Sequence, residues 1–278
     1  MSLVAKIKEK YWTLHSSQKN RSRRRAAPQL PPIVLQASGY CPVCSTNVQF
    51  SARDAWLREN YQCSNCGSVP RERALFVTLE KYFADWRRST IHESSPVNRG
   101  ASKRLAEDSR HYISSQLFPN VALGEMVDGV RCENLESLTF ADDSIDLHIT
   151  QDVLEHVFHP SLAFREIART LKPGGAHIFT VPIPNESKPS KVRARIDERG
   201  EILHLAEPVY HGNPVSEKGA LVTVDWGFDI CQHIFAACGL FTHLICIDDE
   251  TRGIKGELLH VLVTLKPGAA VADTDPIP

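Results

Sequence analysis

The sequence carries almost no net charge, and no part of it is apolar over a long stretch. Its 278 residues hold 32 Lys and Arg against 33 Asp and Glu, which gives a net charge of -1 at pH 7. A chain of this kind has no overall attraction to nucleic acid or to an anionic membrane. The N-terminus "MSLVAKIKEKYWTLH" has no secretory apolar core, and no segment approaches a membrane span. We therefore expect a cytoplasmic protein without a transmembrane segment.

Segments of strand and helix character alternate from Ser89 onward. Apolar runs such as "STIHE", "HYISSQLF", "SIDLHIT" and "AHIFTVPIP" are typical of strands, while "HPSLAFREIARTL" and "WGFDICQHIFAACG" are typical of helices. This alternation predicts an α/β fold with a mostly parallel sheet covered on both faces. The last two strand segments are separated only by "DDETRGIKG", which is too short for a parallel crossover. The final strand should therefore pair antiparallel.

Composition divides the chain into five parts. Residues 1–38 read as a flexible tail with a basic run at Lys19, Arg21, Arg23, Arg24 and Arg25, a solvated segment that could alternatively touch RNA or anionic lipid. A cysteine module covers 39–70, and "RERALFVTLEKYFADW" predicts a linker helix within 71–88. The α/β domain covers 89–268, with an insertion at 183–224. Residues 269–278 are expected to be disordered.

Four of the eight cysteines form two identical "CxxC" pairs. Eighteen residues separate the first pair, Cys41 and Cys44, from the second, Cys63 and Cys66. Each pair directs two thiolates at one ion, and tetrahedral zinc takes four ligands. A redox dithiol or four unrelated thiols are the alternatives. Four protein ligands leave no position for water, so we expect a structural zinc ribbon. The other cysteines, Cys132, Cys231, Cys238 and Cys246, are expected in the core.

The stretch "LTFADDSIDLHITQDVLEHVFHPSLAFREIARTLKPGGAHIFTVP" resembles the second half of class I S-adenosylmethionine-dependent methyltransferases of the type 11 kind. The shared features are "LTF-DDSID", "VLEH" and "LKPGG", and the preceding "CPVC" and "CSNC" resemble a subset of these enzymes that carries an N-terminal zinc ribbon. The resemblance implies a Rossmann-like sheet of seven strands. It also implies methyl transfer from S-adenosylmethionine to a small-molecule or glycan acceptor.

The first half departs from that family. Where its members carry an acidic residue followed by a glycine-rich loop, this chain reads "ESSPVNRG", with Glu93 and one late glycine, Gly100. Ser114, Ser115 and Gln116 stand where a carboxylate normally binds the ribose, and Asn134 stands at the adenine-facing aspartate. The resemblance implies cofactor contacts at Glu93, Ser94, Ser95, Gln116, Asn134, Leu135, Gln151 and Asp152. In the alternative interpretation Glu93 pairs with Arg99, and Asn134 only closes a turn.

The insertion at 183–224 is expected to cover the cofactor crevice as an acceptor lid, or else to be a structural loop over the sheet edge. From its "EPVYHGNP" we take Tyr210 and His211, together with His156 of "VLEH", as the candidate catalytic residues. A local capping role is the alternative for Glu155 and His156. His148 lies within a strand, so the sequence cluster of His148, His156 and His159 is not expected to bind metal. Two further functions stay open: an RNA-modifying methyltransferase, although nucleic acid is not an expected partner, and a non-catalytic binding protein of the same fold.

Overall fold

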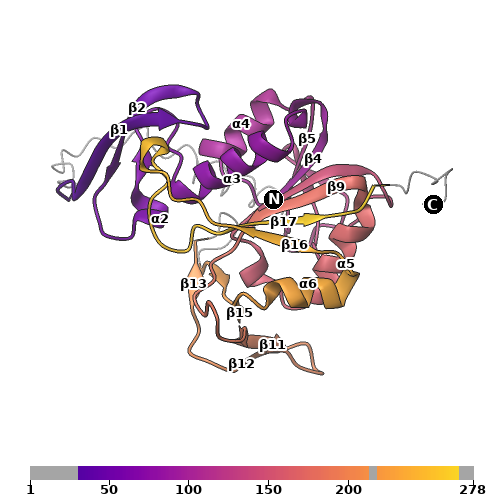
Figure 1. The fold of residues 1–278 in the computed structure, drawn as a ribbon. Helices are drawn as coiled ribbons and strands as arrows, with labels where there is room; N and C mark the ends of the chain where they lie inside the picture. Colours follow the sequence, from indigo (N-terminus) through magenta and orange to yellow (C-terminus); the bar gives the residue numbers. More distant parts are fainter. Residues whose placement is uncertain (1–30, 213–217, 269–278) are drawn as a thin grey trace, which may run out of the picture.

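An eight-stranded sheet runs through the centre of the molecule (Figure 1). The computed structural model describes residues 31–212 and 218–268. The strand order is β16-β17-β9-β8-β4-β5-β7-β6. The parallel centre consists of β4 (Thr90–Ser94), β5 (His111–Gln116), β7 (Val130–Cys132), β8 (Ile145–Gln151) and β9 (Leu171–Thr180).

The final strand pairs antiparallel, as the short connection before it predicted. β17 (Val261–Leu265) is antiparallel to both β9 and β16 (Thr242–Ile245). The predicted count of seven strands was wrong by one, because β6 (Met126–Val127) folds back on β7 as a tight hairpin. Asp128 and Gly129 form its turn, and both have positive φ angles.

Helices cover both faces of the sheet, as the alternation predicted. α3 (Pro70–Tyr82) and α4 (Gly100–Asp108) lie together on one face, and α5 (Pro160–Thr170) and α6 (Ile230–Cys238) lie together on the other (Figure 1). α6 ends at Gly239, whose φ of +73° is left-handed and ends the helix without steric cost. Three short 3-10 helices, η1 (Trp86–Arg88), η2 (Leu154–His156) and η3 (Glu250–Arg252), complete the helical part. Within the described residues, no helix combines the length and apolar character needed to cross a membrane.

The cysteine module is a small three-stranded sheet with one helical turn. Its strands are β1 (Leu35–Cys41), β2 (Thr46–Ala52) and β3 (Gln62–Cys63), and α2 (Leu57–Asn60) lies between the last two. β1 begins at Leu35, before the predicted start of the module at residue 39. The basic run at 19–25 and the tail at 269–278 lie outside the described residues.

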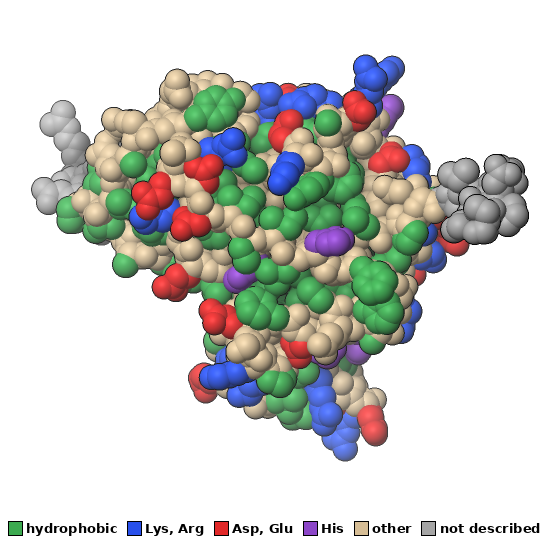
Figure 2. All heavy atoms as spheres, in the orientation of Figure 1, with side chains coloured by type: hydrophobic (Ala, Val, Ile, Leu, Met, Phe, Trp, Pro, Cys, Tyr) green, Lys and Arg blue, Asp and Glu red, His purple; other side chains and the backbone are tan. Residues whose placement is uncertain are grey.

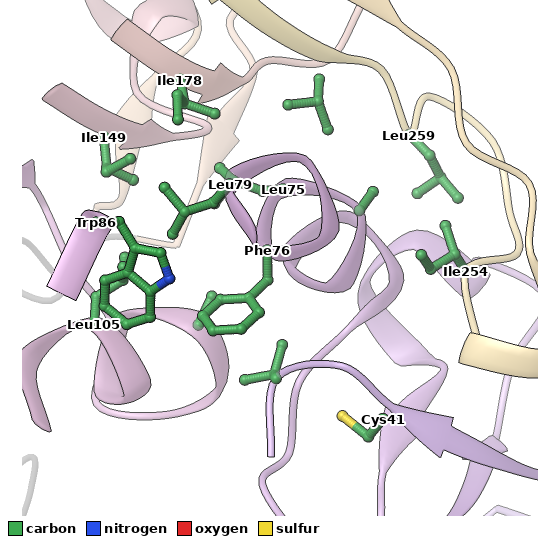
Figure 3. Packing of buried hydrophobic residues seen from close by; sticks show 14 of the residues in the cluster. Cys41, Leu75, Phe76, Leu79, Trp86, Leu105, Ile149, Ile178, Ile254 and Leu259 are labelled. Atoms are coloured by element: carbon green, nitrogen blue, oxygen red, sulfur yellow. The ribbon is translucent and has the colours of Figure 1, made fainter. Parts of the chain in front are cut away.

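One hydrophobic core joins this module to the α/β domain. Cys41 and Phe50 of the module belong to the same buried cluster as Leu75 and Phe76 of α3 and Ile149 of β8. Figure 3 shows α3 at the centre of this cluster, with residues of the sheet and of the β16–β17 connection around it. The module is therefore part of the domain's core.

A buried arginine adds hydrogen bonds to that junction. Arg73 of α3 has no exposed surface and donates to the backbone oxygens of Tyr61, at 2.7 Å, and Gly253, at 2.6 Å. A buried guanidinium needs such acceptors, since an unpaired charge away from water is costly. The module, α3 and the β16–β17 connection are fixed to one another by these bonds.

The insertion at 183–224 forms three small antiparallel ribbons. They are β10 (Lys191–Val192) with β15 (Val224–Asp225), β11 (Ala194–Ile196) with β12 (Ile202–His204), and β13 (Tyr210–His211) with β14 (Ala220–Leu221). In Figure 1 these ribbons extend from the sheet as a separate lobe next to α6.

Candidate functional site

The four cysteine sulfurs converge on one point in the module. Cys41 Sγ lies 3.8 Å from Cys66 Sγ, and Cys44 Sγ lies 3.8 Å from Cys63 Sγ. All four atoms lie within 4.8 Å of one another. A tetrahedron with zinc–sulfur bonds of about 2.3 Å has edges of about 3.8 Å. The cysteines therefore fit a closed, four-coordinate zinc site. Of the remaining cysteines, Cys246 was expected in the core but is exposed, because it lies at the end of the edge strand β16.

The predicted cofactor residues gather at the carboxyl ends of neighbouring parallel strands. In the pairing register, Ser94 lies opposite Ser115 on one side and Thr150 on the other, so Gln116 and Gln151 follow at the same edge. In sheets of this kind, ligands bind in the crevice outside these strand ends. The sheet therefore brings most of the predicted set to one edge, from segments far apart in sequence.

Glu93 points inward at this edge. Its carboxylate is fully buried and accepts hydrogen bonds from Ser102 Oγ at 2.6 Å, Tyr112 Oη at 2.7 Å and Gln151 Nε2 at 2.9 Å. Burial raises the pKa of Glu93, and these three donors oppose that rise. Its predicted contact with a cofactor stays a prediction. Gln151 keeps a buried amide oxygen, Oε1, with no partner among the described residues.

The cysteine module forms hydrogen bonds to the segment between β4 and α4. Ser95 takes a left-handed φ of +57°, and its N–H donates to Ser115 O at 2.7 Å. The N–H of Gly100, the first residue of α4, donates to Cys66 O at 3.1 Å. Arg99 donates to Gly67 O at 3.0 Å. The second cysteine knuckle thus lies on the helix end that follows the loop.

Gly100 is required where it stands. Its φ is +53°, and a Cβ there would lie 1.9 Å from Glu72 Oε2. Glu72 of α3 is buried, accepts from the N–H of Val69, and pairs with Arg99 at 2.6 Å. The alternative pairing of Arg99 with Glu93 is therefore wrong, because Glu72 takes that arginine instead.

Asp152 forms an ion-pair cluster with the cysteine module. Its carboxylate accepts from Arg58 Nη1 at 2.5 Å and Nη2 at 2.8 Å, and lies 3.0 Å from Arg71 Nε. Thr180 Oγ1 donates to it at 2.9 Å. Burial alone raises the pKa of Asp152, but Arg71 and Arg58 outweigh burial and hold the pKa well below its ordinary value. Asp152 is an ionised anchor for two arginines, and its predicted cofactor contact stays untested.

The remaining cofactor candidates are Gln116, Asn134 and Leu135. Asn134 accepts from the N–H of Glu136 through Oδ1 at 3.0 Å, which is the turn-closing role of the alternative interpretation. Gln116 is half-buried and its carbonyl accepts from the N–H of Glu133 at 3.3 Å. Leu135 is buried in the second hydrophobic cluster, next to η2 and α5.

Two of the three predicted catalytic residues meet at a buried carboxylate. His156 Nε2 and His211 Nδ1 each lie 3.7 Å from Glu155 Oε1, and the two rings face each other edge-on at 5.0 Å. Glu155 is 2% exposed, and neither of its carboxylate oxygens has a hydrogen-bond partner among the described residues. Glu155 raises the pKa of His211 above its ordinary value.

The insertion is held against this cluster by hydrogen bonds. His156 Nδ1 donates to Leu221 O at 2.9 Å, while Thr223 donates through its N–H and its hydroxyl to Glu155 O. These bonds hold β14 and β15 against η2. Tyr210 precedes His211 in β13, and neighbouring side chains in a strand point to opposite faces. Tyr210 is half exposed and lies on the other face of the ribbon from Glu155.

Sequence reasoning considered Glu155 beside His156 but did not take it as a site residue, and it missed Arg58 and Arg71. Glu155 stands in "VLEH" beside a predicted residue, so its carboxylate was available as a candidate. Arg58 and Arg71 carry no such mark, because nothing in a linear sequence shows that two arginines near the cysteine module meet the end of β8.

Part of the chain is similar to known proteins. Residues 102–179 match the family described as "Methyltransferase domain". This match supports a class I S-adenosylmethionine-dependent methyltransferase, which is what the sequence motifs predicted. A dimethylglycine N-methyltransferase from Parasynechococcus marenigrum (strain WH8102) is 32% identical over 120 residues. That alignment covers 39% of this chain and 43% of the relative, so the chain spans less than half of that relative's length.

Solved structures give a looser likeness. An S-adenosylmethionine-dependent methyltransferase from Mesorhizobium loti has a TM-score of 0.45 at 16% identity, covering 69% of this chain and 97% of that one. A 1,6-didemethyltoxoflavin-N1-methyltransferase from Burkholderia thailandensis has a TM-score of 0.45 at 14% identity, covering 71% and 78%. These values are too low to identify a shared acceptor.

Proposed function

We propose that this chain transfers a methyl group from S-adenosylmethionine to a small-molecule or glycan acceptor held between the sheet edge and the lid. The observation that carries the proposal is the meeting of His211, from the lid, with Glu155 and His156 at the end of β8. Together with the family match over residues 102–179, this supports an acceptor site beside a cofactor crevice.

The residues at the crevice fit the cofactor in one clear respect. Gln151 Oε1 is a buried acceptor that has no partner within residues 31–212 and 218–268; it lies next to the Glu93 network and can accept from an ammonium group. Bound S-adenosylmethionine supplies an electrophilic methyl group, so the protein's task is to orient the acceptor and exclude water. In the metal-free protein, His156 can take a proton from an acceptor hydroxyl or amine, because its Nδ1–H is held by Leu221 O and Nε2 is left as the base.

We also propose that Cys41, Cys44, Cys63 and Cys66 hold a structural zinc ion. The sulfur separations support this assignment, and four protein ligands leave no open position for chemistry.

Calorimetric titration of the zinc-loaded protein with S-adenosylmethionine and S-adenosylhomocysteine tests the cofactor proposal. We expect binding in the range of tens to hundreds of micromolar, because the ribose carboxylate of the family is missing and a charged hydrogen bond contributes about 1–3 kcal/mol. Gln151→Leu should weaken binding about tenfold, whereas Gln232→Leu, on the exposed surface of α6, should leave it unchanged.

The acceptor site is tested by turnover. His211→Ala should lower kcat while leaving cofactor affinity nearly unchanged, since the lid residue contacts the acceptor. Tyr210, the predicted catalytic neighbour, lies on the other face of the ribbon, so Tyr210→Phe should lower kcat less than His211→Ala does, and an unchanged kcat would remove Tyr210 from the site. A His211→Ala variant that loses cofactor binding would instead place the lid in the cofactor site.

A non-catalytic binding protein of the same fold is the second candidate. It is favoured by the closed loop after β4, where the Gly100 N–H and the Glu93 carboxylate already have protein partners. No heat with either ligand at millimolar concentration, in a folded protein, would select this candidate. Acidic and basic side chains are interspersed on the face shown in Figure 2, so this face does not favour an RNA-modifying role.

A further inference from the structure

Glu155 is a buried carboxylate that the protein leaves without a hydrogen bond. Only 2% of its surface is exposed, and neither Oε1 nor Oε2 has a partner among the described residues. An ionised carboxylate taken out of water costs several kcal/mol unless a cation or donors compensate it. Two imidazole nitrogens lie 3.7 Å from Oε1, beyond hydrogen-bond length.

The hydrogen bond of His156 Nδ1 decides the protonation of the nitrogen that faces Glu155. Nδ1 lies 2.9 Å from Leu221 O, and a carbonyl can only accept, so Nδ1 carries the proton. In the neutral ring, Nε2 then presents a lone pair toward the carboxylate. Two electron-rich atoms that face each other across 3.7 Å are suited to a cation between them. Histidines that bind metals commonly donate their other ring N–H to a backbone carbonyl in this way.

His211 completes the set from the lid. Its Nδ1 faces the same Glu155 oxygen, and the ligand atoms of Glu155, His156 and His211 all lie within 4.8 Å of one another. Bonds of about 2.1 Å to one ion place ligand atoms roughly 3.0–3.4 Å apart. The two distances of 3.7 Å from the histidine nitrogens to Glu155 Oε1 exceed that spacing by less than about 1 Å.

We propose that Glu155, His156 and His211 bind a divalent first-row transition-metal ion. Two imidazoles and one carboxylate are ligands that suit zinc and its neighbours in the row, in contrast to the four thiolates of the cysteine module. Three protein ligands leave coordination positions open. Resting on the proposed function, these positions take oxygen atoms of the acceptor, which makes an acceptor with adjacent hydroxyl groups the expected class.

Metal binding at this site should also stabilise the lid. His156 and Glu155 belong to η2, whereas His211 lies in β13, so the ion joins the lid to the sheet edge. Binding of metal alone should therefore stabilise the lid against proteolysis, independently of any cofactor or acceptor.

Titration of the full, zinc-loaded chain with CoCl2 tests the site. We expect one equivalent of Co²⁺ to bind, with visible d–d absorption and no sulfur-to-cobalt charge-transfer band. Glu155→Gln should weaken Co²⁺ binding by more than about 100-fold, since loss of even an outer partner weakens metal sites 10- to 100-fold. His159→Gln is the matched control: this exposed histidine of the next segment pairs with Glu136 and should bind Co²⁺ like the wild type.

The outcomes separate this site from the proposed function. Should Glu155→Gln not fold, His211→Ala removes an exposed ligand of the lid and must cause the same loss. No binding beyond the cysteine site, or binding that both variants retain, overturns the proposal and leaves a protonated His211 as the partner of Glu155. S-adenosylmethionine is titrated separately without cobalt, so failure of cofactor binding would overturn the methyl-transfer proposal alone.

Discussion

Arg58 of the cysteine module and Asp152 at the end of β8 form a two-pronged ion pair, at 2.5 and 2.8 Å, although 94 residues separate them in the chain. Arg58 is 2% exposed. The pair fixes the module at the edge of the sheet where the candidate site lies. Asp152 directly follows β8 and has a left-handed φ of +55°.

Breaking this pair should cost much of the protein's stability. We expect Arg58→Gln to lower the free energy of unfolding by about 3 kcal/mol, because it leaves a buried carboxylate with one arginine fewer. The control is Arg87→Gln, whose pair with Glu80 is exposed on both sides and should change stability by less than about 0.5 kcal/mol. Urea denaturation of both variants measures the difference. Equal effects would show that the Arg58 pair adds nothing beyond a surface contact.

Zinc removal should destabilise the whole chain. The cysteine module shares its core with α3 and β8, so loss of the ion loosens both parts together. We expect one zinc per chain by elemental analysis, and a fall in Tm of at least about 10 °C in Cys63→Ser, which corresponds to roughly 3 kcal/mol or more. Cys246→Ser removes an exposed thiol and should leave both zinc content and Tm unchanged. A zinc-loaded Cys63→Ser variant of normal stability would contradict the assignment.

Gly100→Ala should be far more harmful than the same change at another left-handed glycine. Gly174 has a φ of +84° and open space at its Cβ position, so Gly174→Ala measures backbone strain alone, about 1–2 kcal/mol. Gly100→Ala adds a clash with the Glu72 carboxylate and should cost at least about 2 kcal/mol more. Thermal unfolding of the two variants side by side is the measurement. Equal losses would mean that Glu72 moves aside freely.

Acid should destabilise the fold through three buried histidines on neighbouring strands. His92 Nδ1 lies 2.8 Å from His148 Nδ1, and His177 Nε2 lies 3.0 Å from Thr150 Oγ1. Burial lowers the pKa of His92 and of His177 to about 3, and that of His148 well below its ordinary value. Because these folded-state pKa values lie below the unfolded value near 6.5, the stabilisation is complete above about pH 6.5 and is lost as pH falls.

The expected loss can be measured directly. At pH 5.5 each histidine should cost about 1.4 kcal/mol, hence roughly 4 kcal/mol for the three, and His211, with its raised pKa, acts in the opposite direction. Urea denaturation at pH 7.5, 6.5 and 5.5 should show this slope. His177→Gln should remove about a third of it, whereas His204→Gln, on the exposed lid, should leave it intact. A stability that does not change between pH 7.5 and 5.5 would contradict the role of these histidines.

The sequence alone determined the layers of the fold. Apolar runs of strand length alternate with amphipathic segments of helix length, and this pattern requires a parallel sheet covered on both faces. The brevity of "DDETRGIKG" determined the antiparallel final strand, which the structure confirms in β17. The two "CxxC" pairs likewise predicted the cluster of Cys41, Cys44, Cys63 and Cys66. Each knuckle is a local turn that brings its own two cysteines together.

Only the tertiary structure decided what the polar residues of the crevice contact. Glu93 was predicted to face a cofactor, yet its partners come from α4, β5 and β8, which no local pattern links to it. Asp152 pairs with Arg58 of the cysteine module and Arg71 of α3. Glu155 lies next to His211 of the insertion. Periodicity determines which face of an element is buried, whereas the partner of a buried charge depends on how distant elements pack against one another.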